Sequence, residues 1–187
     1  MLKSDARKIL SAKRKALTLS DCMKLDDLLL IQFQRFYWAD MHTIGNFFPM
    51  EKQNEPNTLL LAKYLKLILP NITMAYPKIH DNELTMDFYA ETETLIENKW
   101  GIQEPIPFNK IEPAAMDAVL VPMLGFDLNG QRIGFGKGFY DRYFEHYPSK
   151  GLRIGISYFE PISNIQDTHQ FDVPLTHCIT PWNSYEF

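Results

Sequence analysis

The sequence contains few cysteines and no long apolar run. Its 187 residues include two cysteines, Cys22 and Cys178, which lie far apart and have no CxxC partner. This excludes a disulfide framework and indicates reduced thiols in a cytoplasmic protein. The longest apolar runs, such as residues 28–31, are too short to span a bilayer, and charged residues interrupt the apolar ones at the N-terminus. We therefore expect neither a membrane association nor a signal peptide.

An excess of positive charge is also absent. The chain carries 19 basic and 23 acidic side chains, a formal net charge of −4. Because proteins that bind nucleic acid gain affinity by neutralising phosphates, this balance argues against a nucleic-acid partner. The five histidines form no HxxxH or other metal pattern, and we assign none to catalysis. Without repeats or linkers, the chain is expected to form one domain over residues 1–187, as a monomer.

Helical and strand-like patterns alternate along the chain. Apolar periodicity predicts helices over residues 2–17, 21–37, 57–69 and 139–146, the second capped by Ser20 and the third by Asn57. Strands are expected over residues 42–48, 72–76, 84–89, 118–121, 153–158 and 178–180. Residues 50–56 read as a polar loop, and the three prolines within residues 100–113 predict ordered but irregular chain. The alternation predicts an α/β protein with a mostly parallel sheet.

A glycine-rich loop carries the strongest chemical signal. Gly134, Gly136 and Gly138 alternate between a buried strand and a helix. Glycines allow positive φ, so successive N–H groups can point into one concavity next to the helix N-terminus. Arg132 and Lys137 add full positive charges, and together these features favour a polyphosphate site. The loop matches neither a Walker A loop nor a good dinucleotide fingerprint, and the alternative is a tight turn that binds nothing.

Asp141 follows this loop directly. Bound phosphates would repel a carboxylate unless a cation lay between them, which favours Mg²⁺ coordination. A carboxylate in the first turn of a helix is also favourable by itself, so a capping role stays open.

The loop and its surroundings resemble the 5-formyltetrahydrofolate cyclo-ligase family, also called methenyltetrahydrofolate synthetase. That family has a proline after the strand, a Phe-Asp pair, and an arginine leading a Gly-x-Gly-x-Gly-Tyr-Tyr-Asp loop. The matching positions in this sequence are Pro122, Phe126, Asp127, Arg132 and residues 134–141. Further similarity lies in residues 54–58, 100–105, 172–175 and 179–180, and in Lys3 and Arg7 of a Lys-x-x-x-Arg pair. The sequence departs from the family pattern at Phe171, Thr176 and Pro181.

The resemblance implies a fold and an activity. The fold would be a three-layer sandwich around a mostly parallel sheet, of the NagB/RpiA/CoA-transferase type. The activity would be ATP- and Mg²⁺-dependent conversion of 5-formyltetrahydrofolate, with or without a polyglutamate tail, to 5,10-methenyltetrahydrofolate. Two alternatives are a folate-binding homologue without catalysis, and a sugar-phosphate isomerase or transferase on a related scaffold.

The resemblance also implies roles for individual residues. Arg132 and Lys137 would be catalytic, and Asp141 and Asp172 would hold Mg²⁺. The substrate would contact Met50, Glu55, Trp100 and Tyr140. The residues expected to bind ATP are Lys3, Ser4, Asp5, Ala6, Arg7, Arg132, Ile133, Gly134, Phe135, Gly136, Lys137, Gly138, Phe139 and Tyr140.

The first helix presents one basic ridge. At 100° per residue, Lys3, Arg7 and Arg14 fall within about 40° of one another. Lys3 and Arg7 are expected to reach the nucleotide, whereas we expect Arg14 to lie on a solvated face.

Overall fold

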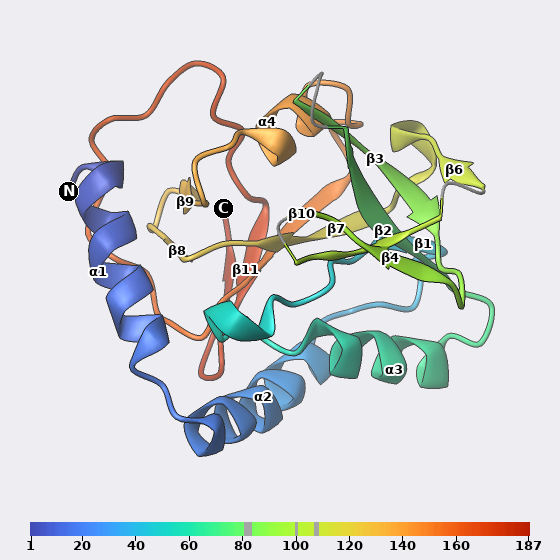
Figure 1. Cartoon of the computed structure of the whole chain (residues 1–187), viewed down its shortest axis with the longest axis horizontal. Helices are drawn as coiled ribbons and strands as arrows, with labels where there is room; N and C mark the ends of the chain where they lie inside the picture. Colours follow the sequence, from blue (N-terminus) through green and yellow to red (C-terminus); the bar gives the residue numbers. More distant parts are fainter. Residues whose placement is uncertain (81–83, 100, 107–108) are drawn as a thin grey trace.

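The computed structural model describes residues 1–80, 84–99, 101–106 and 109–187, which form helices packed around one large sheet (Figure 1). The helices are α1 (Lys3–Lys15), α2 (Leu19–Gln34), α3 (Thr58–Ile68) and α4 (Phe139–Phe144), with 3-10 turns η1 (Glu51–Gln53) and η2 (Pro113–Ala115). The strands are β1 (Thr43–Gly45), β2 (Thr73–His80), β3 (Thr85–Ala90), β4 (Leu95–Glu97), β5 (Gln103–Pro105), β6 (Lys110–Ile111), β7 (Ala118–Pro122), β8 (Gly125–Phe126), β9 (Arg132–Ile133), β10 (Leu152–Ile156), β11 (His177–Ile179) and β12 (Ser184–Glu186).

The central sheet is mostly parallel, as predicted. Its strand order is β12-β11-β10-β7-β1-β2-β3-β6. The five strands from β11 to β2 run parallel, and β12, β3 and β6 add antiparallel pairs at the two edges. The pairs β4–β5 and β8–β9 are separate antiparallel ribbons. The α/β prediction is therefore confirmed.

Two cores separate the molecule into three layers. Alternate residues of β7 face opposite sides: Leu120 packs with α2 and α3, and Val119 packs with α4. Figure 1 shows α2 and α3 along one face of the sheet and α4 on the other. Because both faces are covered, the β7 sequence AVLV is apolar throughout, which is typical of a buried parallel strand. The predicted three-layer arrangement is confirmed.

Helix α1 lies beside the β8–β9 ribbon (Figure 1). Its Leu10 and Ala6 are buried against Ile133 of β9 and Leu124. This packing places the N-terminal helix next to the glycine loop, although the two are more than a hundred residues apart in sequence.

Several predicted details were wrong. The cap of α2 is Thr18, whose side chain accepts the Asp21 N–H in a capping box, and not Ser20. Asn57 caps α3 as predicted, by accepting the Leu60 N–H. The segment expected to be irregular contains two short strands: β5 pairs with β4, and β6 pairs with β3.

In the described part of the chain, no helix combines the length and apolar character needed to cross a membrane.

Candidate active site

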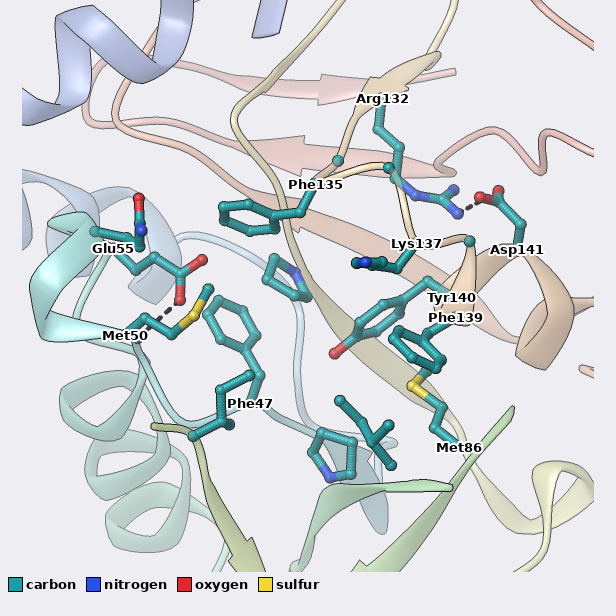
Figure 2. A pocket seen from close by; sticks show the side chains of 18 of the residues that line it. Phe47, Met50, Glu55, Met86, Arg132, Phe135, Lys137, Phe139, Tyr140 and Asp141 are labelled. Carbon is teal, nitrogen blue, oxygen red and sulfur yellow. Dashed lines mark hydrogen bonds and ion pairs between the residues drawn. The ribbon is translucent and has the colours of Figure 1, made fainter. Parts of the chain in front are cut away.

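A cavity of about 390 Å³ lies beyond the carboxyl ends of the central parallel strands. Residues that follow β1, end β7 and belong to β2 line it, together with the glycine loop and α1. The lining consists of Lys3, Arg7, Phe47, Phe48, Met50, Gln53, Glu55, Pro77, Ile79, Met86, Ile102, Glu104, Pro122, Gln131, Arg132, residues 134–141, Asp172 and Val173. Figure 2 shows labelled side chains from both sides of this space.

The strand expected over residues 118–121 does not lead straight into the glycine loop, because a separate ribbon lies between them. After β7 the chain forms the β8–β9 ribbon, and Arg132 itself belongs to β9. Gly136 and Gly138 have φ values of +89° and +72°, a region that costs other residues about 1 kcal/mol or more. A Cβ at Gly138 would lie 2.8 Å from Nη1 of Arg142, which also donates through Nη2 to the Lys137 carbonyl at 2.7 Å. The loop is thus fixed from behind, with its concave side facing the cavity.

Two cations of α1 face this loop. Arg7 Nε donates to the Gly134 carbonyl at 3.0 Å. Lys3 Nζ lies 2.5 Å from Oδ2 of Asp172, with only 12% of the lysine side chain exposed. The ion pair therefore joins the amino end of α1 to the segment around Asp172, and both of its residues line the cavity.

Arg132 and Asp141 form an ion pair, drawn as a dashed line in Figure 2, in which the arginine side chain is 8% exposed and the aspartate side chain 28% exposed. Arg132 also donates to the Val173 carbonyl, and Asp141 accepts the Val173 N–H at 3.1 Å. Burial lowers the pKa of Arg132, and the Asp141 carboxylate opposes that effect. The ion pair with Arg132 by itself accounts for the position of the Asp141 side chain. Neither a capping role nor a bound metal ion is needed to explain that position.

Lys137 differs from these cations because it is exposed. Within the described residues, its ammonium group has no hydrogen bond or ion pair with another side chain. Figure 2 shows it directed into the cavity between Arg132 and Tyr140. Its charge is therefore available to an incoming ligand.

We call Lys3, Arg7, Arg132 and residues 134–138 the cationic wall, and the facing surface the apolar wall. The apolar wall consists of Phe47, Phe48, Met50, Pro77, Ile79 and Met86.

Glu55 is the carboxylate set into the apolar wall. It is 7% exposed, and its Oε2 accepts the Met50 N–H at 2.8 Å. Burial raises the pKa of Glu55, while the Met50 hydrogen bond and nearby Arg14 lower it. Its Oε1 and the Tyr140 hydroxyl are both buried without a hydrogen-bond partner among the described residues. Figure 2 shows these two side chains entering the cavity from opposite sides.

The expectation for Arg14 was wrong. Its side chain is 3% exposed and donates through Nη1 to the Met123 carbonyl at 2.9 Å. Helical periodicity places it on the ridge of Lys3 and Arg7, but that ridge packs against the body of the protein and does not face solvent.

The predicted nucleotide residues separate into two groups. Lys3, Arg7, Arg132 and residues 134–140 line the cavity. Ser4 and Asp5 are exposed outside it, and Ala6 and Ile133 are fully buried in the α1–β9 contact. Trp100, expected at the substrate, lies outside the described residues.

Asp141 and Asp172 both line the cavity, as a metal site there would require. No group of three or more His, Cys, Asp or Glu side chains suited to a metal ion occurs within the described ranges. Magnesium commonly uses one or two carboxylates and completes its shell with phosphate oxygens and water, so these two residues fit such an ion.

The Phe-Asp pair has a structural role. Asp127 is fully buried, and its Oδ1 accepts the N–H groups of Asn129 and Gln131 at 2.9 and 3.0 Å. Its Oδ2 accepts the Ile165 N–H at 2.9 Å. One carboxylate thereby shapes the β8–β9 turn and attaches it to the segment after β10, which fixes the strand that carries Arg132.

Sequence reasoning missed most of the apolar wall. Phe47, Phe48, Pro77 and Ile79 lie at or near the carboxyl ends of parallel strands, a position that could have identified them. Met86 comes from the antiparallel edge strand β3, and no sequence pattern points to it.

Glu104 was also missed. It is 5% exposed, accepts the Ile79 N–H at 3.1 Å and lies 3.5 Å from Lys78 Nζ. It therefore attaches β5 to β2 beside the cavity.

Comparison with known proteins agrees with this geometry. The chain is 28% identical over 181 residues to the 5-formyltetrahydrofolate cyclo-ligase of Mycoplasma genitalium, covering 94% of this chain and 97% of that protein. It is 30% identical to the Mycoplasma pneumoniae protein of the same name, covering 84% and 86%.

Solved structures give the same result. The 5,10-methenyltetrahydrofolate synthetase of Aquifex aeolicus superposes with a TM-score of 0.83 at 26% identity, covering 100% of this chain and 93% of that one. The synthetase from Mycoplasma pneumoniae gives 0.77 at 29% identity, covering 97% and 99%. The sequence profile of one family matches residues 2–181. The chain therefore belongs to the 5-formyltetrahydrofolate cyclo-ligase family.

Proposed function

We propose that this protein converts 5-formyltetrahydrofolate to 5,10-methenyltetrahydrofolate, using Mg²⁺ and ATP and releasing ADP and phosphate. The observation that carries the proposal is a single cavity with two unlike walls: a glycine loop with cations on one side, and an apolar surface holding one buried carboxylate on the other. Family membership over residues 2–181 supports the same reaction.

The reaction explains why both walls are needed. The formyl oxygen is a poor leaving group. It therefore first accepts the γ-phosphoryl group of ATP, and ADP is released. N10 of the folate then attacks the formyl carbon, a C–N bond closes the ring, N10 loses its proton to solvent, and the C–O bond breaks as phosphate departs. As in other phosphoryl transfers, the protein mainly positions the groups and neutralises charge.

The cationic wall would bind the nucleotide. Backbone N–H groups of residues 134–140 would hold the phosphates, and Lys3 and Arg7 would contact them from α1. Arg132 and Lys137 would stabilise charge on the transferred group, while Asp141 and Asp172 would hold Mg²⁺. Ser4, Asp5, Ala6 and Ile133 would support this wall from outside the cavity lining.

The apolar wall would bind the folate. The amino and ring N–H groups of a pterin suit the free oxygen of Glu55. Met50 and Tyr140 would pack against the ring system. Trp100, whose position lies outside the described residues, belongs to the same proposal.

One assay tests the proposal. Protein, Mg-ATP and 5-formyltetrahydrofolate are mixed, methenyl absorbance is followed, and ADP is measured by a coupled reaction. We expect both signals to rise together, and to require ATP. Folded protein that binds folate without releasing ADP would instead support the non-catalytic homologue.

The magnesium role has its own test. Asp141→Asn should shift the Mg²⁺ concentration needed for half-maximal turnover upward. An unchanged magnesium titration together with lower turnover would leave Asp141 only as the partner of Arg132.

We further propose a cytoplasmic monomer. Both cysteines are free thiols, which suits a reducing compartment. Light scattering of the purified protein tests the mass of the particle.

A further inference from the structure

Arg14 is a buried cation behind the apolar wall, outside the cavity lining. Besides donating to the Met123 carbonyl at 2.9 Å, its guanidinium carbon lies 5.4 Å from the centre of the Phe135 ring. The Asn54 side chain donates to the Arg14 carbonyl at 3.0 Å, which joins the end of α1 to the η1 segment. The guanidinium is thus held in one place, next to the segment that carries Glu55.

Two buried polar atoms face each other at this point. Arg14 Nη2 lies 3.7 Å from Glu55 Oε1, and neither atom has a hydrogen-bond partner in the described part of the protein. A buried polar group without a partner costs about 1–3 kcal/mol. Glu55 lines the cavity and Arg14 does not, so of the two groups only Glu55 borders the space that a ligand would fill.

We propose that Arg14 is a positioning residue that keeps Glu55 ionised and leaves Oε1 free for the N–H donors of the substrate's pterin ring. This inference rests on the proposed function. Burial alone favours the neutral form of a carboxyl group, and a neutral carboxyl carries a hydroxyl donor of its own. A nearby cation fixed by a separate hydrogen bond opposes that preference without occupying the cavity.

Few other ionisable groups act on Glu55. From α4, the Tyr140 hydroxyl faces it across the cavity, and burial raises the pKa of Tyr140. After β10, the Tyr158 hydroxyl donates to Asp26 Oδ1 at 2.7 Å and lies 3.4 Å from the Glu55 carbonyl oxygen, and burial raises the pKa of Tyr158 also. Both tyrosines are therefore neutral near pH 7. Lys137 lies toward the far side of the cavity in Figure 2, which leaves Arg14 as the cation behind the carboxylate.

The test measures dissociation constants of 5-formyltetrahydrofolate and of ATP by calorimetry from pH 6 to 8.5. For the unaltered protein we expect the dissociation constant of 5-formyltetrahydrofolate to change little with pH. Without Arg14 the Glu55 pKa rises, so the neutral form increases as pH falls. Arg14→Met should therefore weaken folate binding at least about tenfold at pH 6 and progressively less toward pH 8.5. The dissociation constant of ATP should stay within about twofold of that of the unaltered protein.

Three further variants separate this role from simple packing. Glu55→Gln should weaken folate binding equally at every pH, and the double variant should behave like Glu55→Gln. Arg14→Lys should restore much of the pH-independent binding because it keeps the charge.

Equal loss of folate and ATP binding in Arg14→Met, or a folate loss independent of pH, would overturn the inference. If Arg14→Met does not fold, Arg14→Gln takes its place, because glutamine keeps hydrogen-bond donors and lacks the charge. A pH-dependent folate loss in Arg14→Gln that exceeds any ATP loss supports the inference, and a pH-independent loss overturns it. Failure of the unaltered protein to bind folate would instead contradict the proposed function.

Discussion

The two walls of the cavity satisfy their polar groups in different ways. On the cationic wall, Lys3, Arg7 and Arg132 already have protein partners, so their charges are held in place before any ligand arrives. By contrast, the open polar atoms of Glu55 in the apolar wall and of Tyr140 opposite it are buried and lack partners among the described residues. Preorganised positive charge suits phosphate, which is common to many nucleotides. Unpaired hydrogen-bond donors and acceptors among apolar side chains instead discriminate one ring system from another. We therefore expect substitutions on the cationic wall to change turnover, and substitutions on the apolar wall to change folate affinity.

Arg132→Met should have the largest effect on turnover. It removes a cation that is paired with Asp141 and that we propose stabilises the transferred phosphoryl group, and loss of one such preorganised group typically lowers kcat by about 10²–10³-fold. Arg132→Lys should recover part of kcat, because lysine keeps the charge but lacks the planar fork. Methenyl formation per folded molecule, with folding checked by circular dichroism, measures both. Arg35→Met, at an exposed position after α2, is the matched control. Normal turnover of Arg132→Met would remove this residue from the mechanism.

Lys137→Ala should lower kcat by about tenfold to a hundredfold, less than Arg132→Met, because an exposed lysine is more mobile and more screened. Its free energy of unfolding should change by less than about 0.5 kcal/mol, since no described side chain pairs with it. Steady-state kinetics and urea unfolding test the two statements separately. Lys63→Ala, an exposed lysine of α3, should change neither quantity. Unchanged kcat in Lys137→Ala would mean that Arg132 alone supplies the charge.

The difference between the walls also explains what the sequence could predict. The glycine loop, Arg132 and Lys137 occupy one continuous segment, so their shared role is visible in the linear pattern. The apolar wall is assembled from β1, β2, β3 and the η1 segment, and a set of contacts among distant residues leaves no local pattern. Periodicity correctly grouped Lys3, Arg7 and Arg14 on one ridge, but it gives no information about which other element covers that ridge.

The errors in the fold have local causes. Two-residue strands such as β8 and β9 are too short to show alternation, so the ribbon before the glycine loop was missed. The cap of α2 could have been predicted from the sequence, because Thr18 and Asp21 have capping-box spacing. The longer features, namely the buried run of β7 and the helices, were predicted correctly because several turns or residues carry the same signal.

Met50→Ala tests the apolar wall directly. Met50 lines the cavity, and we propose that its thioether packs against the folate. Its removal should raise the KM for 5-formyltetrahydrofolate about tenfold, while kcat and the KM for ATP stay within about twofold. The backbone N–H that binds Glu55 is kept, so the carboxylate remains in place. Initial rates at varied 5-formyltetrahydrofolate and saturating ATP give the KM for the folate. Initial rates at varied ATP and saturating folate give the KM for ATP. Met23→Ala, at an exposed position on α2, is the control. A rise in the ATP constant of equal size would contradict the division between the walls.

The smallest expected effect concerns Asp172, which joins the cationic wall to the C-terminal segment. Burial alone would raise its pKa, but hydrogen bonds from Lys3 and the His169 N–H, with the lysine charge, hold it below the ordinary carboxyl value. A lowered native pKa stabilises the fold above about pH 4, and that stabilisation is lost as pH falls through the native value. Asp172→Asn should therefore cost less than about 1 kcal/mol at pH 7, and the difference from the unaltered protein should shrink below pH 4. Urea unfolding at pH 7, 5, 4 and 3.5 measures it, with Glu145→Gln as an exposed carboxylate control. A difference that stays constant down to pH 3.5 would mean that Asp172 contributes through backbone geometry and not through its charge.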